Sequence, residues 1–78
     1  MPDDILVDAR WLDPPEPMER AMDAIGRREP GQRIRMLLHR EPIPLYGMLK
    51  QFGLRYRTTP IEDGCYEIVI DDAPDGMP

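Results

Sequence analysis

The segment from Asp8 to Ile25, DARWLDPPEPMERAMDAI, decides the fold because it joins a buried strand to a helix. Its centre holds prolines at positions 14, 15 and 17. The first N–H groups of a helix have no intrahelical partner, so proline costs little there and its fixed φ suits the first turn. The prolines therefore predict a helix start with Pro14 as the N-cap, and they fix the angle between strand and helix.

The same prolines remove hydrogen-bond donors from the helix start. Of residues 14–17, only Glu16 keeps a backbone N–H. A helix start binds phosphate and other oxyanions chiefly through these N–H groups. The sequence thus argues against an oxyanion site here and predicts a rigid, apolar surface.

Apolar residues mark the elements on either side of the prolines. The run Ile5–Ala9 is short and apolar, as in a buried strand. After the prolines, the i, i+3, i+4, i+7 spacing of one helix face is occupied by Met18, Ala21, Met22 and Ile25. Pro30-Gly31 is expected to end this helix.

The arrangement recurs in the segment 41–52, EPIPLYGMLKQF. Glu41 is the expected N-cap, and prolines follow at positions 42 and 44. The helical spacing again marks an apolar stripe, formed by Leu45, Met48, Leu49 and Phe52. Gly53 is the expected C′ residue of this second helix.

Three further strands complete the pattern. Residues 33–38 alternate, with arginines on one face and on the other Ile34, Met36 and Leu38. Residues 54–60 and 65–70 flank Glu62-Asp63-Gly64, which indicates a β-hairpin. The order β-α-β-α-β-β predicts an α/β (α+β) two-layer sandwich, in which two helices cover one face of a small mixed four-stranded sheet.

Length and charge limit the class of protein. The 78 residues suit a single domain, with an ordered core of about residues 5–70 and acidic flexible tails at 1–4 and 71–78. The net charge is −5, and the tails hold Asp3, Asp4, Asp71, Asp72 and Asp75. Acidic and basic residues balance between the tails, which argues against nucleic acid as a partner. No apolar run approaches the roughly 20 residues of a membrane helix and no signal peptide is apparent, so we expect a cytoplasmic protein.

The segment Val7–Pro17 resembles a known motif. Small sulfur-carrier proteins of the TusA (SirA-like) family carry Leu-Asp-x-Arg-Gly-Leu-x-Cys-Pro-x-Pro between a strand and a helix. The matching residues in this chain are Asp8, Arg10, Leu12, Pro15 and Pro17. The resemblance implies the same β-α-β-α-β-β fold over most of the chain.

Two positions depart from that motif. Trp11 stands where the family has glycine, and Pro14 stands where it has the cysteine that carries the persulfide. The chain is more similar to a branch of TusA-like domains of unknown function that lacks this cysteine and carries Pro-Pro-Glu-Pro and His-x-Glu-Pro-x-Pro-Leu-Tyr, here residues 39–46. The resemblance implies a non-catalytic module in a redox- or metal-linked pathway, since members of that branch accompany hemerythrin-like and similar domains.

Candidate binding residues follow the two parallel strands, where open α/β sheets bind ligands. They are Arg10, Trp11, Glu16, His39, Glu41 and Tyr46. In one interpretation they form a patch for a protein partner or small ligand, with Trp11 and Tyr46 as flat apolar contacts. In the other they are structural: Trp11 caps the core, and Arg10 pairs with Glu16 or Glu41.

Two rival hypotheses concern reactive side chains. His39, the sole histidine, together with Glu41 would bind a metal or heme or move a proton, although a stable metal site usually needs three or four protein ligands. Cys65, expected to face solvent, would act as an unorthodox sulfur carrier. Neither pattern predicts a cofactor or an enzyme, so the leading hypothesis is a non-catalytic binding module.

Arginines gather on the expected open face of the sheet. The alternation places there Arg33, Arg35, Arg55, Arg57 and Glu67. One interpretation is a set of cross-strand ion pairs, and another is a docking surface for an acidic partner. Single-stranded RNA is disfavoured because no aromatic residues interleave with the arginines.

Overall fold

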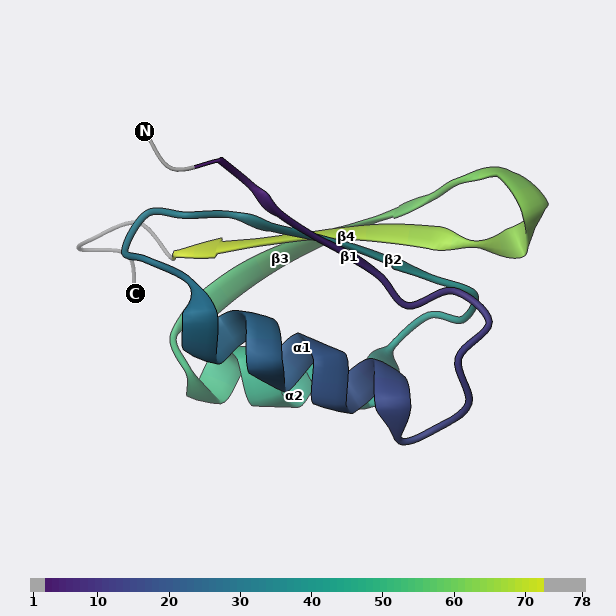
Figure 1. Cartoon of the computed structure of the whole chain (residues 1–78), viewed down its shortest axis with the longest axis horizontal. Helices are drawn as coiled ribbons and strands as arrows, with labels where there is room; N and C mark the ends of the chain where they lie inside the picture. Colours follow the sequence, from purple (N-terminus) through teal and green to yellow (C-terminus); the bar gives the residue numbers. More distant parts are fainter. Residues whose placement is uncertain (1–2, 73–78) are drawn as a thin grey trace.

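The chain forms a four-stranded mixed sheet with both helices on one face, as the computed structural model of residues 3–72 shows (Figure 1). The elements follow in the order β1 (Ile5–Asp8), α1 (Glu16–Arg27), β2 (Ile34–Leu38), α2 (Ile43–Gln51), β3 (Leu54–Pro60), a 3-10 turn (Glu62–Gly64) and β4 (Tyr66–Asp72). The predicted two-layer α+β sandwich is confirmed. Within residues 3–72, neither helix is long and apolar enough to span a bilayer.

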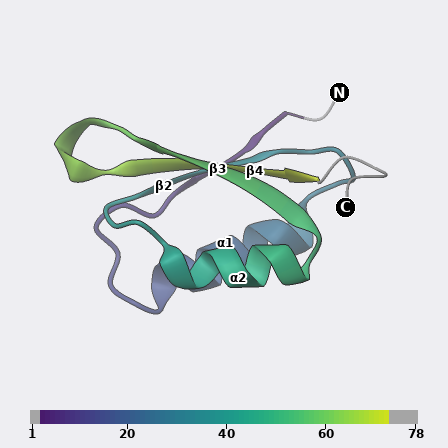
Figure 2. The ribbon, with the colours of Figure 1, turned by 180° about the vertical axis from the view of Figure 1, so that it is seen from behind.

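The order of the strands in the sheet is β1-β2-β4-β3. Strands β1 and β2 are parallel and joined through α1, whereas β4 runs antiparallel to both β2 and β3. The view from behind shows both helices beneath the same face, with the other face uncovered (Figure 2). The carboxyl ends of β1 and β2 therefore meet at one edge, where the chain leaves each strand for the following helix.

Alternation along the strands builds the core between sheet and helices. The side chains that are almost fully buried are Ile34, Met36, Leu45, Leu49, Ile68 and Ile70. Two residues of the expected helix stripes lie outside this core: Met22 is 46% exposed and Phe52 is 51% exposed. Ala24 takes the inner position on α1, and Phe52 falls at the C-cap of α2, where the chain already turns toward β3.

Both helices begin one residue later than expected, and in the same way. The N-cap residues are Pro15 and Pro42, and neither helix has a side-chain cap. Pro17 and Pro44 then occupy the second helical position, where the missing N–H costs no hydrogen bond. The bond between Pro14 and Pro15 is cis.

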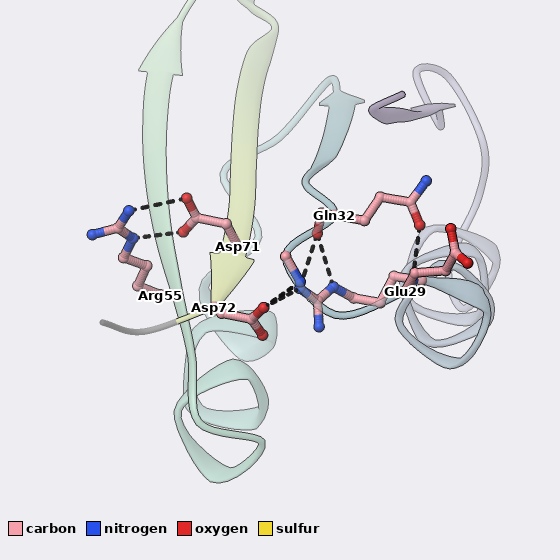
Figure 3. Close-up of polar contacts among 7 residues, drawn as sticks. Glu29, Gln32, Arg55, Asp71 and Asp72 are labelled. Atoms are coloured by element: carbon pink, nitrogen blue, oxygen red, sulfur yellow. Dashed lines mark hydrogen bonds and ion pairs between the residues drawn. The ribbon is translucent and has the colours of Figure 1, made fainter. Parts of the chain in front are cut away.

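The prediction that a flexible C-terminal tail begins at residue 71 is wrong, because β4 extends to Asp72. Asp71 and Asp72 belong to β4 and are paired, with Asp71 2.6 Å from Arg55 and Asp72 3.0 Å from Arg28 (Figure 3). Asp72 also accepts a hydrogen bond from the backbone N–H of Gly31, and together with Arg28 this lowers the pKa of its carboxyl. The strand reaches Asp72 because its acidic end pairs with the start of β3 and is held by these ion pairs. In the expected N-terminal tail, Asp4 pairs with Arg33, while residues 1–2 and 73–78 lie outside the described residues.

The burial of α2 gives a test of the core. Replacing Leu49, which is fully buried, by alanine should lower the free energy of unfolding by about 2–5 kcal/mol. The same change at Phe52 should cost much less, because half of that side chain already faces water. Urea denaturation of the two variants measures the difference, and equal losses would contradict the observed position of Phe52.

Candidate functional site

The two helix starts enclose a groove at the carboxyl ends of β1 and β2. Its volume is about 290 Å³, and we call it the proline groove. Its lining consists of Leu12, Pro14, Pro15, Pro17, Met18, Met36, Leu38, His39, Arg40, Pro42, Pro44 and Leu45. The groove thus lies where the sequence predicted a rigid apolar surface, between the two proline segments.

Each wall of the proline groove has a simple origin. Prolines of the two helix starts present rings in place of backbone N–H groups, so they offer apolar contact and no donors. Met36 and Leu38 come from the inner face of β2, while Met18 and Leu45 open the apolar stripes of the two helices. No carboxylate, hydroxyl or thiol lines the groove among residues 3–72, so its lining is mostly apolar, and its polar side chains are those of His39 and Arg40.

Trp11 and His39 form a contact at the rim. Trp11 has φ 67°, in the left-handed region, and is 68% exposed. Its backbone N–H donates to Nδ1 of His39 at 2.9 Å, and the two rings stack with centroids 5.2 Å apart. Because Nδ1 accepts this hydrogen bond, the neutral His39 ring carries its proton on Nε2.

Asp8 and Arg10 brace the turn that presents Trp11. The Asp8 carboxylate accepts hydrogen bonds from Nε and Nη2 of Arg10 at 2.9 and 2.8 Å, and from the Arg10 backbone N–H at 3.2 Å. The side-chain bond with Arg10 is the main cause that lowers the pKa of Asp8 from 3.8 to about 2. The expectation that Arg10 pairs with Glu16 or Glu41 is therefore wrong, because Asp8 is two residues away and satisfies the guanidinium locally.

Tyr46 is engaged by residues of β3 whereas Trp11 contacts His39, so the six candidate residues do not form one cluster. The Tyr46 ring stacks on Tyr56 of β3 with centroids 4.3 Å apart, and its hydroxyl contacts Thr58 at 2.6 Å. The same hydroxyl donates to Glu41 at 3.2 Å, and burial raises its pKa. Tyr46 and Glu41 thus form a separate cluster between α2 and β3.

The remaining candidate, Glu16, lies on α1 with its carboxylate 4.0 Å from Arg20. The fold thus brings the candidates together in two pairs, Trp11 with His39 and Tyr46 with Glu41, while Arg10 pairs with Asp8. The sequence predicts a surface at the proline segments, but the prolines themselves, Met36, Leu38 and Arg40 are not among the candidate site residues. The repeated proline pattern was the signal that placed two helix starts at one edge of the sheet.

The reactive side chains of the rival hypotheses occupy unfavourable positions. Cys65 was expected to face solvent, but it is only 2% exposed, with Sγ 3.8 Å from the carbonyl oxygen of Asp63. In the part of the chain that the structure describes, no group of three metal-binding side chains occurs. His39 has one ring nitrogen engaged by Trp11, and Glu41 is engaged by Tyr46.

The uncovered sheet face carries the expected arginines. Arg33 pairs with Asp4 at 3.1 Å, and Arg35 and Arg55 pair across strands with Glu67 and Asp71. Arg57 has no ion pair among residues 3–72. Arg35 and Arg55 thus form cross-strand ion pairs, as one of the two interpretations predicted.

Comparison with known proteins defines the class. A crystal structure of a SirA-like protein from Desulfitobacterium hafniense matches with a TM-score of 0.71 and 26% identity, over 85% of this chain and 93% of that chain. The fold is thus that of the SirA-like proteins. Residues 6–71 match the family described as "Uncharacterized conserved protein (DUF2249)", and the chain belongs to that family. The comparison with curated proteins gives no match.

The left-handed backbone at Trp11 predicts an unusual effect of glycine. Replacement by glycine should leave a protein about 1 kcal/mol more stable than replacement by alanine, because both remove the stacked ring but only glycine relieves the Cβ strain. At Met22, an exposed position within α1, the order should reverse, since glycine in a helix costs about 1 kcal/mol relative to alanine. Urea denaturation of the four variants measures both differences; greater stability of alanine at position 11 would contradict the observed backbone.

The Asp8–Arg10 pair predicts a measurable titration. In a ¹³C NMR titration the Asp8 carboxyl should show a pKa of about 2. In Arg10→Gln this pKa should rise toward 3.8. Because the folded-state pKa is lowered, the pair stabilises the fold above pH 3.8, and this contribution is lost as the pH falls toward 2. An Asp8 pKa that does not change in Arg10→Gln would contradict the contact.

Proposed function

We propose that this chain is a non-catalytic binding module that keeps the SirA-like scaffold and holds an apolar group in the proline groove. The observation that carries the proposal is the lining of the groove, which combines five prolines with Met and Leu side chains and, among residues 3–72, contains no carboxylate, hydroxyl or thiol. A partly open, mostly apolar groove of this size, with a few polar groups in its lining, has the character of a small-ligand site.

The position of Pro14 supports the non-catalytic part of the proposal. Pro14 stands where the resembling sulfur carriers have their cysteine, and it lines the groove. Proline has no atom that forms a persulfide, so sulfur carriage at this corner would require another residue. We therefore assign the chain to the branch that lacks the motif cysteine and place it in a redox- or metal-linked pathway, as the resemblance implies.

Trp11 supports a binding role at the rim. A residue other than glycine in the left-handed region costs of order 1–2 kcal/mol, and such strain is concentrated at functional sites. Trp11 retains this conformation with 68% of its surface exposed, so burial in the core does not explain its presence. Its ring offers a flat contact surface to the part of a small ligand, or of a protein partner, that projects beyond the groove.

The test uses a neutral apolar probe, 1-octanol, and ¹⁵N-labelled protein. We expect octanol to shift the amide signals of groove residues such as Leu12, Met18 and Leu38, and Pro44→Glu to abolish these shifts by placing a carboxylate in the apolar wall. Glutamate suits the first turn of a helix, so Pro44→Glu should fold. Pro60→Glu, an exposed proline at the end of β3, is the matched control and should retain them. Shifts spread over other surfaces, or unaltered in Pro44→Glu, would refute the proposed site.

The sulfur-carrier alternative requires Cys65 and makes a different prediction. Because Cys65 is buried, incubation with a cysteine desulfurase and cysteine should leave the mass of the intact protein unchanged. Cys65→Ser is the control for any adduct. A gain of one sulfur atom in the wild type that is absent from Cys65→Ser would favour the alternative over the non-catalytic module.

A further inference from the structure

We propose that the ligand of the proline groove is a small aliphatic carboxylate, with its chain among the prolines and its carboxylate beside Arg40. This inference rests on the proposed binding role of the groove and adds the chemical class of the ligand. It follows from the polar residues of the lining, which are only His39 and Arg40 among residues 3–72.

Arg40 is the charged residue of the lining. It is exposed at the rim and forms no ion pair with any residue from 3 to 72. Most other arginines of the chain are paired, including Arg10, Arg28 and Arg55. A guanidinium beside an apolar surface binds a carboxylate strongly because its fork of N–H donors matches the two oxygens.

The neighbouring acids have other partners. Glu41, the next residue, accepts a hydrogen bond from the Tyr46 hydroxyl at 3.2 Å, on the β3 side of α2. Glu16, at the start of α1, lies 4.0 Å from Arg20. No carboxylate from the described part of the chain lines the groove, so the charge of this lining is positive although the whole chain has a net charge of −5. Charge complementarity therefore selects an anionic head group.

His39 adds a second donor. Its Nδ1 is occupied by the Trp11 N–H at 2.9 Å, so the neutral ring has its proton on Nε2, and this residue lines the groove next to Arg40. The polar side of the groove thus consists of donors, whereas the walls are apolar and the prolines supply no N–H. A ligand that matches both the donors and the apolar walls has acceptor oxygens at one end and a hydrocarbon chain, as an aliphatic carboxylate has.

The experiment compares octanoate with 1-octanol by NMR titration at neutral pH. The two probes share the hydrocarbon chain and differ in charge. In Arg40→Gln we expect octanoate to bind roughly fivefold more weakly, the usual effect of one partly exposed ion pair, and octanol to bind as in the wild type. Arg57→Gln is the matched control, because Arg57 also lacks an ion pair among the described residues but lies on the opposite face of the sheet; it should alter neither affinity.

The outcomes separate this inference from the proposed function. If octanol and octanoate both bind in the groove but Arg40→Gln changes neither affinity, or both equally, the carboxylate assignment is overturned and the apolar site stands. If neither probe shifts the groove signals, the proposed function fails as well. Tighter binding of an N-acetylated peptide ending in a leucine carboxylate than of octanoate would overturn the assignment to a small molecule, since the head group would then come from a protein terminus.

Discussion

The removal of backbone donors from two neighbouring helix starts is the constraint on which the site depends. Helices α1 and α2 each follow a parallel strand, β1 and β2, after a short loop. Pro17 and Pro44 occupy the same position in the two first turns. At this edge of a sheet, helix N–H groups ordinarily attract phosphate or stabilise an anion. Proline converts that polar edge into apolar walls at little cost to the helices, because the missing N–H groups had no intrahelical partners. The groove is thus a property of the chain direction and of the prolines together.

The turn between β1 and α1 combines stabilising and strained features. Asp8 and Arg10 pair locally and hold the turn, as a motif shared with sulfur carriers would suggest. Trp11 then adopts a conformation that suits the glycine found at this position in the resembling family, and its hydrogen bond and stacking with His39 compensate part of the strain. In the function that we propose, replacement of both the glycine and the cysteine changes this corner from a reactive one into a surface that offers contacts without bond formation.

Periodicity predicted the fold well because strands and helices bury one face each. The order of elements, the inner residues of β2 and the open-face position of the arginines followed from spacing alone. The misassignments arose where tertiary contacts decide. Tyr46 points to β3 because Tyr56 and Thr58 offer a ring and a hydroxyl there, and Cys65 is buried although it lies beside a turn. The two proline segments indicated the position of the groove. That Met36 and Leu38 of β2 also line it could be predicted only by knowing that β1 and β2 are adjacent.

Proline at both helix starts should make the proline groove rigid before any ligand binds. The most direct test is ¹⁵N relaxation of the free protein at amides next to the prolines: Glu16, Met18, Ile43 and Leu45. We predict order parameters of about 0.85, equal to those of the central strands. Values below about 0.6 at either helix start would show that the walls move independently on the ps–ns timescale, and would contradict the claim that proline fixes the groove.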